Sequence, residues 1–398
     1  MARRNGGFIG TDGLDAPDPP TGVAGTAGDA SVSVAFTAPT DVGTSAITGF
    51  VATTDAGDGA TGSSSPITIS SLTNGTAYTT RVYAINAFGT SAASVASASF
   101  TPQAFRRAVF GGGDTGSGTN VMQFINLNTA GNSTDFGDLV AANPSVAGAS
   151  SITRGIFAGG EASGNRTDVM QYITIANTGN TTDFGNLSSD KNSVGGLSNN
   201  TRALFYSGYN GNRVNDIEYV TIANTGNVTD FGNLTNIGQG PNKGIIASST
   251  RGIIANNTNN TERSNIIEYV TIGTTGNTTD FGDTSAAKSG VESCCSSTRG
   301  IIAGGATGGS GINVIEYITI ANTGNTTDFG DLNVASTIGA GASSNTLGVF
   351  AGGTTSGNRH DSIDQITIAS TGNATDFGNL LAANQTMGAV SSDHGGLQ

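Results

Sequence analysis

The stretch Asn322-Thr-Gly-Asn-Thr-Thr-Asp-Phe-Gly-Asp-Leu332 decides the fold, because its core, Thr-Asp-Phe-Gly, occurs six times in 398 residues. Successive copies lie 47 to 50 residues apart. Their aspartates are Asp135, Asp183, Asp230, Asp280, Asp328 and Asp376. A fixed period of this size indicates a repeat architecture, in which each repeat is one supersecondary unit.

Each copy contains three further apolar segments. A small-residue stretch, as at 146–151, precedes Arg-Gly-Ile-Phe-Ala-Gly-Gly, as at 154–160, and Ile-Glu-Tyr-Val-Thr-Ile follows, as at 217–222. Four short strands in 40–50 residues are typical of a propeller blade. The double glycine with an aromatic residue downstream resembles the kelch repeat, and the phenylalanine of Thr-Asp-Phe-Gly takes the place of the kelch tryptophan.

The repeats are out of phase with the ends of the chain. The first copy begins at Arg107 without a small-residue strand, whereas the chain ends with 388–394, which matches the small-residue strand of the second copy. We therefore expect residues 107–398 to form a six-bladed kelch-like β-propeller. Its first blade would be completed by the C-terminal strand, which would contain His394 and remove the exposed edges of an open array.

The repeated residues have predicted roles. Each Phe should pack between adjacent blades, and each Asp should bond turn amides or pair with the repeated arginine. The arginines are Arg107, Arg154, Arg202, Arg251 and Arg299, and Leu347 stands in the sixth copy. Gln365 likewise replaces the aromatic residue there. Cys294 is aligned with Gly148 and Cys295 with Ala149, as small core residues near the axis.

Composition favours an all-β chain and excludes several functions. Gly is abundant (61 residues), helix formers are scarce, and no run is long enough to span a membrane. A formal charge of −13 with 16 basic residues and no basic stripe argues against nucleic-acid binding. With two histidines, we expect no catalytic residues, no metal and no cofactor. Asp216 and Glu218 are interpreted as solvated strand-edge residues.

Residues 17–102 have a different pattern. Ser31-Val-Ser-Val-Ala-Phe36 alternates as a half-buried strand does, and Leu72-Thr-Asn-Gly-Thr-Ala-Tyr78 suggests a tyrosine corner. This stretch resembles a fibronectin type III domain, with Phe36 where that family usually has a core tryptophan. Residues 1–16 are expected to be an extended arm, either a disordered terminus or an anchor that orders against a partner through Arg3, Arg4, Phe8 and Ile9.

The whole arrangement resembles virion structural proteins of marine tailed bacteriophages, notably those infecting cyanobacteria. The residues that carry this resemblance are Met1-Ala-Arg-Arg-Asn-Gly-Gly-Phe-Ile-Gly10, the fibronectin-like domain, Tyr-Ile-Thr-Ile and Asn-Thr-Gly-Asn-x-Thr-Asp-Phe-Gly. The resemblance implies a non-enzymatic fibre, tail or capsid-decoration protein, assembled in the host cytoplasm and located in the virion. Its partners would be other virion proteins, a host-surface glycan and copies of itself.

Two other functions are consistent with the sequence. One is that of a secreted propeller-type carbohydrate-binding or carbohydrate-active protein, and the other is that of an intracellular scaffold of the kelch kind. Ligand contacts are expected in the polar loops that vary most between copies, because variable loops on a rigid scaffold commonly carry recognition. The candidates are Tyr209, Asn212, Arg213, Asn259, Glu262, Arg263, Asn358, Arg359 and His360.

Overall fold

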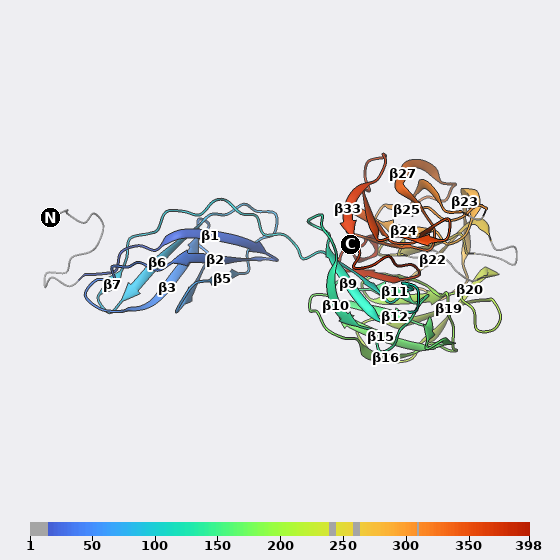
Figure 1. Ribbon diagram of the computed structural model, residues 1–398, viewed down its shortest axis with the longest axis horizontal. Coiled ribbons are helices and arrows are strands. Elements are labelled where there is room, and N and C mark those ends of the chain that lie inside the picture. Colours follow the sequence, from blue (N-terminus) through green and yellow to red (C-terminus); the bar gives the residue numbers. More distant parts are fainter. Residues whose placement is uncertain (1–14, 239–243, 258–262, 309) are drawn as a thin grey trace. The chain divides into compact units, whose positions relative to one another are not determined.

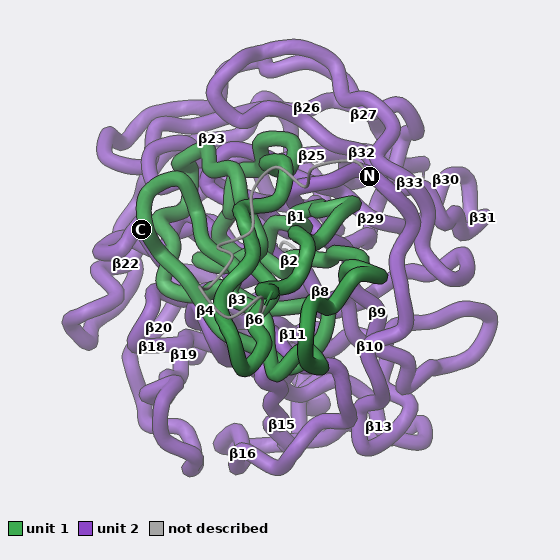
Figure 2. Tube along the Cα trace, turned by 90° about the vertical axis from the view of Figure 1, so that its left-hand side faces the viewer, with its two compact units in different colours: residues 1–105 green, residues 106–398 purple. Residues whose placement is uncertain are grey.

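The computed structural model describes residues 15–238, 244–257, 263–308 and 310–398 (Figure 1). The chain divides into two compact units, Met1–Phe105 and Arg106–Gln398, which Figure 2 colours separately. Among the described residues there are strands and one three-residue 3-10 helix, η1 (Gly395–Leu397), but no α-helix. The predicted all-β class is therefore confirmed.

Unit 1 consists of two antiparallel sheets, ordered β1-β2-β5 and β4-β3-β6-β7. Their bounds are β1 Thr21–Gly28, β2 Ser31–Thr37, β3 Ile47–Thr54, β4 Gly59–Gly62, β5 Ile67–Ser70, β6 Thr80–Asn86 and β7 Gly89–Thr90. The alternation in β2 buries Val32, Val34 and Phe36 against one common core. Phe36 lies 4.8 Å from the ring of Phe50, so a ring pair fills the expected tryptophan position.

The tyrosine corner is present, since the backbone N–H of Thr73 donates to the Tyr78 hydroxyl at 3.1 Å. The free edge of β6 is covered in an unexpected way. Ser91, Ser94 and Ser97 are buried, and each hydroxyl accepts from a β6 backbone N–H at 2.9–3.0 Å. Serines spaced by three therefore satisfy the edge of β6 where a regular strand would otherwise pair.

The described residues of unit 2 form six successive antiparallel sheets of three or four strands, besides two short hairpins. Sheet 1 is β34 (Gly388–Ser391), β8 (Arg107–Gly111), β9 (Val121–Asn126) and β10 (Thr134–Asp138); sheet 2 is β11 (Ala147–Ser150), β12 (Arg154–Ala158), β15 (Val169–Thr174) and β16 (Thr182–Asn186). Sheet 3 is β17 (Gly195–Ser198), β18 (Arg202–Tyr206), β19 (Val214–Thr221) and β20 (Thr229–Gly238); sheet 4 is β21 (Arg251–Ala255), β22 (Ser264–Thr271) and β23 (Thr279–Lys288). Sheet 5 is β24 (Glu292–Cys295), β25 (Arg299–Ala303), β26 (Ile312–Thr319) and β27 (Thr327–Ser336); sheet 6 is β28 (Ala340–Ser343), β29 (Leu347–Ala351), β32 (Ser362–Thr367) and β33 (Thr375–Asn379).

Successive sheets are joined by the repeated motifs themselves. The backbone N–H two residues after each phenylalanine donates to an asparagine side chain in the next repeat's Gly-Asn turn, at 2.9–3.1 Å. The pairs are Asp138 with Asn180, Asn186 with Asn227, Asn233 with Asn277, Asp283 with Asn325, Asp331 with Asn373, and Asn379 with Asn132. The last pair joins sheet 6 to sheet 1, so the same contact occurs at all six interfaces, which we call seams.

The glycine of each Thr-Asp-Phe-Gly makes this contact possible. It has a φ of 140–152°, and a Cβ there would overlap the backbone carbonyl of the next repeat's turn glycine or, for Gly378, of Gly131. Only glycine tolerates both the left-handed backbone and the close approach. The phenylalanines are buried against apolar residues of the following sheet, as predicted: Phe184 lies in one cluster with Ile222, and Phe377 in one with Leu127. In Figure 2 the outer strands accordingly follow one another in order around unit 2.

The predicted pairing of arginine with the Thr-Asp-Phe-Gly aspartate is wrong. Each arginine lies 3.9–4.3 Å above the aromatic ring of its own sheet and donates to one or two backbone carbonyls of the next sheet. Arg154, for example, contacts Tyr172, Ile222 O and Ala223 O. The aspartates are exposed, so solvent hydrates them instead.

The C-terminal segment pairs with β8, as expected: Gly388 to Ser391 lie opposite Gly111 to Ala108. His394 lies beyond this strand, where it is buried and caps η1 through a hydrogen bond from Gly396 N to Nδ1 at 3.2 Å. Burial lowers the pKa of His394 to about 4, so its ring is neutral at pH 7. The predicted strand was therefore too long by three residues.

The cysteine alignment was wrong by one position. Cys294 and Cys295 lie opposite Ile301 and Gly300, whereas Ala149 and Ser150 lie opposite Ile156 and Gly155. Cys295 is thus equivalent to Ser150. Cys295 bonds Ala247 through its sulfur, much as the Ser343 and Ser198 hydroxyls bond Cys295 O and Ser150 O. A small polar side chain links neighbouring inner strands at this position.

Candidate functional site

The loops between the second and third strands of a sheet contact the connection that enters that sheet. Bridges join Tyr209 to Asn192, Asp114 to Gln385, and Thr354 to Thr337. Polar residues from two successive sheets therefore meet at these three seams. These seams are the places where unit 2 could recognise a ligand.

Two of these loops are copies of one hairpin. The first hairpin pairs β13 (Glu161–Ala162) with β14 (Asn165–Arg166) through the turn Ser163-Gly-Asn-Arg166. The second pairs β30 (Thr354–Thr355) with β31 (Asn358–Arg359) through Ser356-Gly-Asn-Arg359. Both serines have a positive φ, 52° and 50°. The same turn therefore projects one arginine from sheet 2 and another from sheet 6.

The two arginines have different partners. Arg359 Nη2 lies 2.7 Å from Asp114 Oδ2, which also accepts from Gln385 Nε2 at 3.0 Å. Burial alone would raise the pKa of Asp114, but the hydrogen bonds from Arg359, Gly116 and Gln385 lower that pKa below its ordinary value. At seam 6–1 the charge of Arg359 is therefore neutralised by an ion pair within the protein, with Asp114.

At seam 2–3 a tyrosine stands where seam 6–1 has the aspartate. Tyr209 follows Ser207-Gly208 as Asp114 follows Gly112-Gly113, and the Arg166 guanidinium lies 5.4 Å from the Tyr209 ring. A surface cavity of about 340 Å³ adjoins this pair, lined by Asn165, Arg166, Ser189, Asp190 and Asn210. Within the described parts of the chain, Arg166 has no carboxylate within 4.0 Å.

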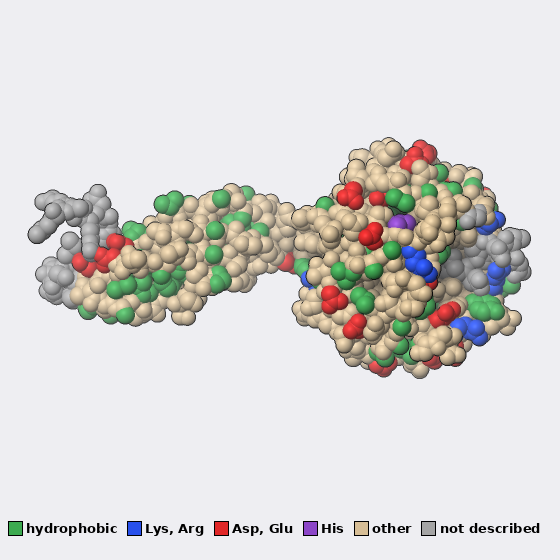
Figure 3. Space-filling model, in the orientation of Figure 1, with side chains coloured by type: hydrophobic (Ala, Val, Ile, Leu, Met, Phe, Trp, Pro, Cys, Tyr) green, Lys and Arg blue, Asp and Glu red, His purple; other side chains and the backbone are tan. Residues whose placement is uncertain are grey.

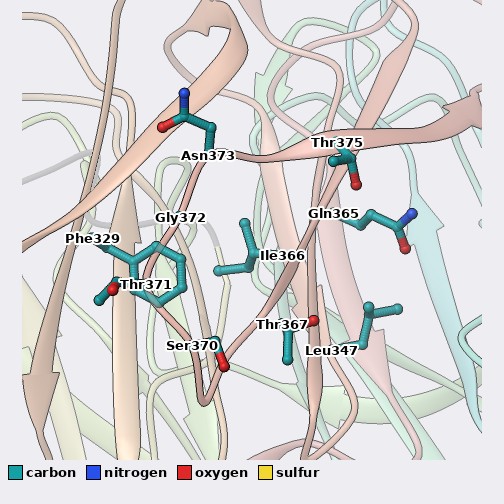
Figure 4. Close-up of a pocket in the computed structure, with 10 residues that line it drawn as sticks. All are labelled: Phe329, Leu347, Gln365, Ile366, Thr367, Ser370, Thr371, Gly372, Asn373 and Thr375. Carbon is teal, nitrogen blue, oxygen red and sulfur yellow. The ribbon is translucent and has the colours of Figure 1, made fainter.

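A different cavity, also about 340 Å³, lies beside strand β32 (Figure 4). Leu347 and Gln365 border it on one side, Phe329 and Thr371 on the other, and Asn373 at one end. In the other repeats the equivalents of Leu347 and Gln365 are an arginine stacked on an aromatic ring. The cavity is present in the sixth repeat because Leu347 and Gln365 are smaller than the arginine and aromatic ring that they replace. No charged residue lines it.

Buried charges lie deeper in the seams. Lys191 Nζ bonds Glu218 at 2.9 Å and also Asp216, and Lys288 Nζ bonds Glu316 at 2.5 Å. The expectation that Asp216 and Glu218 are solvated is therefore wrong for Glu218, which is 3% exposed, because a lysine from the preceding connection enters the seam. These pairs join sheet 2 to sheet 3 and sheet 4 to sheet 5, and both lysines and both glutamates are buried.

Seam 5–6 has Ser336 where those seams have lysine. The Ser336 hydroxyl donates to Glu292 Oε1 at 2.6 Å and lies 3.3 Å from His360 Nε2. Burial, with a smaller contribution from nearby Asp364, raises the pKa of Glu292 to about 8 against the opposing hydrogen bonds from Ser336 and Gly339, so this carboxyl is protonated at pH 7. Burial also lowers the pKa of His360, against the opposite effect of Asp364 and Asp361.

The predicted ligand residues do not form one site. Tyr209, Asn212 and Arg213 share a loop at seam 2–3, where Arg213 bridges back to Tyr209. Asn358 and Arg359 lie at seam 6–1, and His360 is half-buried. Arg263 donates to Gly308 O at 2.6 Å. Asn259, Glu262, Arg3, Arg4, Phe8 and Ile9 lie outside the described residues.

The candidate ligand residues chosen from the sequence did not include Arg166, Asp190 and Asn210, which line the charged cavity. The duplicated Ser-Gly-Asn-Arg turn was the signal that could have identified Arg166. Among the described residues, no three His, Cys, Asp or Glu side chains are placed to hold a metal. Nor does that part of the chain contain a helix long and apolar enough to cross a membrane. Figure 3 shows charged side chains scattered over the visible face of unit 2.

Comparison with known proteins identifies the first unit only. Residues 18–100 match the fibronectin type III domain family, so this part of the chain is a fibronectin type III domain. No curated protein matches the chain. The six sheets of unit 2 are therefore interpreted from their own contacts.

Proposed function

We propose that the chain is a non-enzymatic structural protein of a tailed-phage virion, in which unit 2 is a closed six-bladed kelch-like β-propeller. The arm and the fibronectin type III domain would attach to other virion proteins, and the propeller would be displayed to bind a host-surface glycan. The protein would assemble in the host cytoplasm and act in the particle.

The propeller rests on contacts that recur at every seam. The asparagine contact, the glycine approach and the buried phenylalanine occur six times each, and the sixth set runs from sheet 6 to sheet 1. Pairing of β34 with β8 gives sheet 1 its inner strand. A closed ring leaves each sheet covered on both faces, which an open stack could not do for its end sheets.

The virion role is supported by the N-terminal stretch Met1–Gly10 together with a fibronectin type III domain and near-identical polar repeats. The single observation that carries the binding role is the charged cavity at seam 2–3, because polar groups from two sheets converge there with one arginine not ion-paired. The alternative is a secreted propeller-type carbohydrate-binding or carbohydrate-active protein, for which the same cavity would serve.

Two experiments test the proposal. Mass spectrometry of purified phage particles should find this chain in stoichiometric amounts, and its absence would refute the virion role. Glycan-array binding should be lost when residues 209–214 are deleted. Unchanged binding after that deletion would assign the propeller a spacing or protective role instead.

A further inference from the structure

The same hairpin places Arg166 and Arg359, but among the described residues only Arg359 forms an ion pair. The Ser-Gly-Asn-Arg turns share their positive-φ serine and their pairing pattern. Arg359 has Asp114 and Gln385 as partners, whereas the matching positions at seam 2–3 are Tyr209 and Asn192. Glu161, directly opposite Arg166 in the hairpin, accepts from Asn192 instead of forming an ion pair with Arg166.

Four other polar residues line the cavity at seam 2–3 together with Arg166. Asp190 lines the same cavity but is not within 4.0 Å of any described Arg or Lys nitrogen. Asn192 is already engaged, because its side chain bonds Glu161 and its backbone pairs with Tyr209. Asn165, Ser189 and Asn210 therefore supply the remaining hydroxyl and amide groups.

The donor set indicates the chemistry of a ligand. A guanidinium presents a planar fork that matches a carboxylate bidentately. Amides, a hydroxyl and a carboxylate are the groups that bind sugar hydroxyls, which both donate and accept. A volume of about 340 Å³ is at the small end of ligand cavities and suits a short sugar segment.

We propose that the cavity between sheets 2 and 3 binds a carboxylated sugar, with the sugar carboxylate on Arg166 and its hydroxyls on Asn165, Asp190 and Asn210. This inference rests on the proposed glycan-binding function and names its ligand class. The formal charge of −13 opposes a polyanion at long range, but salt near 0.15 M screens charges beyond about 8 Å, so the local contact decides.

The test is binding of a galacturonic acid trimer to the full chain at 0.15 M salt, measured by calorimetry. The neutral methyl ester of the same trimer is the first control, and acetate is the second. We expect the acid trimer to bind at least tenfold more tightly than the ester. No measurable binding of the acid trimer at 10 mM would overturn the proposal. Binding of acetate as tight as that of the trimer would also overturn it, because the site would then recognise a carboxylate without the sugar.

Variants assign the site. Arg166→Ala should weaken binding of the acid trimer about tenfold or more, the loss expected when one bidentate charge-assisted contact is removed. Arg359→Ala, on the matching hairpin, should leave binding within twofold. Equal losses in both variants, or none in Arg166→Ala, would refute the assignment. Arg166 is exposed, so an unchanged melting temperature checks the fold.

This experiment separates the two proposals. If the chain is present in particles but does not bind the trimer, the ligand class fails and the virion role stands. If it binds the trimer but is absent from particles, the virion role fails and the ligand class stands.

Discussion

Seam 6–1 and the other five seams are built from the same motifs, yet they are held differently. At five seams an arginine stacks on an aromatic ring and bonds carbonyls of the next sheet, as Arg251 does with Tyr269 and Ile320. At seam 6–1 those positions are Leu347 and Gln365, and Leu347 packs instead against an apolar cluster that includes Leu127. The arginine contact is therefore dispensable where something else joins the sheets.

Across seam 6–1, Arg359 of sheet 6 pairs with Asp114 of sheet 1. Within sheet 1, the strand from the end of the chain is held as the inner strands of other sheets are. The Arg107 backbone exchanges two hydrogen bonds of 3.0 Å with Ser392, just as the Arg154 backbone exchanges two with Ser151. Arg106 also pairs with Asp393 at 2.7 Å. The repeated motifs therefore fix how sheets pack, and seam 6–1 adds an ion pair of its own.

Removing the strand that completes sheet 1 should have the largest effect. Deleting residues 388–398 exposes the edge of β8 and removes Ser392 and Asp393, so we expect unit 2 to lose its cooperative thermal transition and to aggregate. Unit 1 has its own core and should still unfold separately. Deletion of the exposed Gln398 alone is the control. An unchanged melting temperature for the long deletion would contradict the comparison.

Gly378→Ala tests whether seam 6–1 uses the same glycine contact as the others. A Cβ at Gly378 would overlap Gly131 O at a φ of 152°, so we expect a loss of about 3 kcal/mol in the free energy of unfolding. Gly131→Ala, where nothing lies within 4 Å of the added carbon, should cost under about 1 kcal/mol. Equal effects in urea unfolding would show that the sixth contact is absent.

Glu292→Gln tests whether seam 5–6, where Ser336 replaces the lysine, contains a buried carboxyl that makes stability depend on pH. The pKa of Glu292 is about 8 in the folded protein against an ordinary 4.5, because burial favours the neutral acid. The folded state therefore keeps a proton that the unfolded state releases, and Glu292 makes stability fall as pH rises from about 4.5 to 8. The glutamine variant should lose that slope and be more stable by about 2 kcal/mol at pH 7. Parallel pH–stability curves for the variant and the parent would contradict this.

Arg251→Ala should have the smallest effect. It removes stacking on Tyr269 and two hydrogen bonds of 2.9 Å at a partly exposed seam, so we expect a loss of about 1–2 kcal/mol. Leu347→Ala, the matching change at seam 6–1, removes only apolar contact and should cost about 1 kcal/mol. Thermal unfolding of both variants measures the difference. A larger loss for Leu347→Ala would reverse the ranking of the two contacts.

Much of the fold could be predicted because the information repeats. Six copies of one phrase define the sheets, and Leu72 to Tyr78 identified the fibronectin type III domain. The contacts between sheets could not be predicted, since a motif does not show which repeat its side chain reaches. Pairing with the repeated arginine was therefore one of the two predicted contacts of the Thr-Asp-Phe-Gly aspartate, whereas the arginine reaches carbonyls of the next sheet. Arg166 was not among the chosen residues, because the sequence does not show that its hairpin faces Tyr209 of the neighbouring sheet and not a carboxylate.

The most direct test of the closed ring is cross-linking between cysteines placed at two equivalent seams. Asn132→Cys with Asn379→Cys spans seam 6–1, and Asp331→Cys with Asn373→Cys spans seam 5–6 at the same hydrogen-bonded positions. A short bifunctional thiol reagent should join both pairs within one chain at similar rates, as seen by peptide mass spectrometry. Cross-linking at 331–373 without any at 132–379 would mean that sheet 6 does not meet sheet 1.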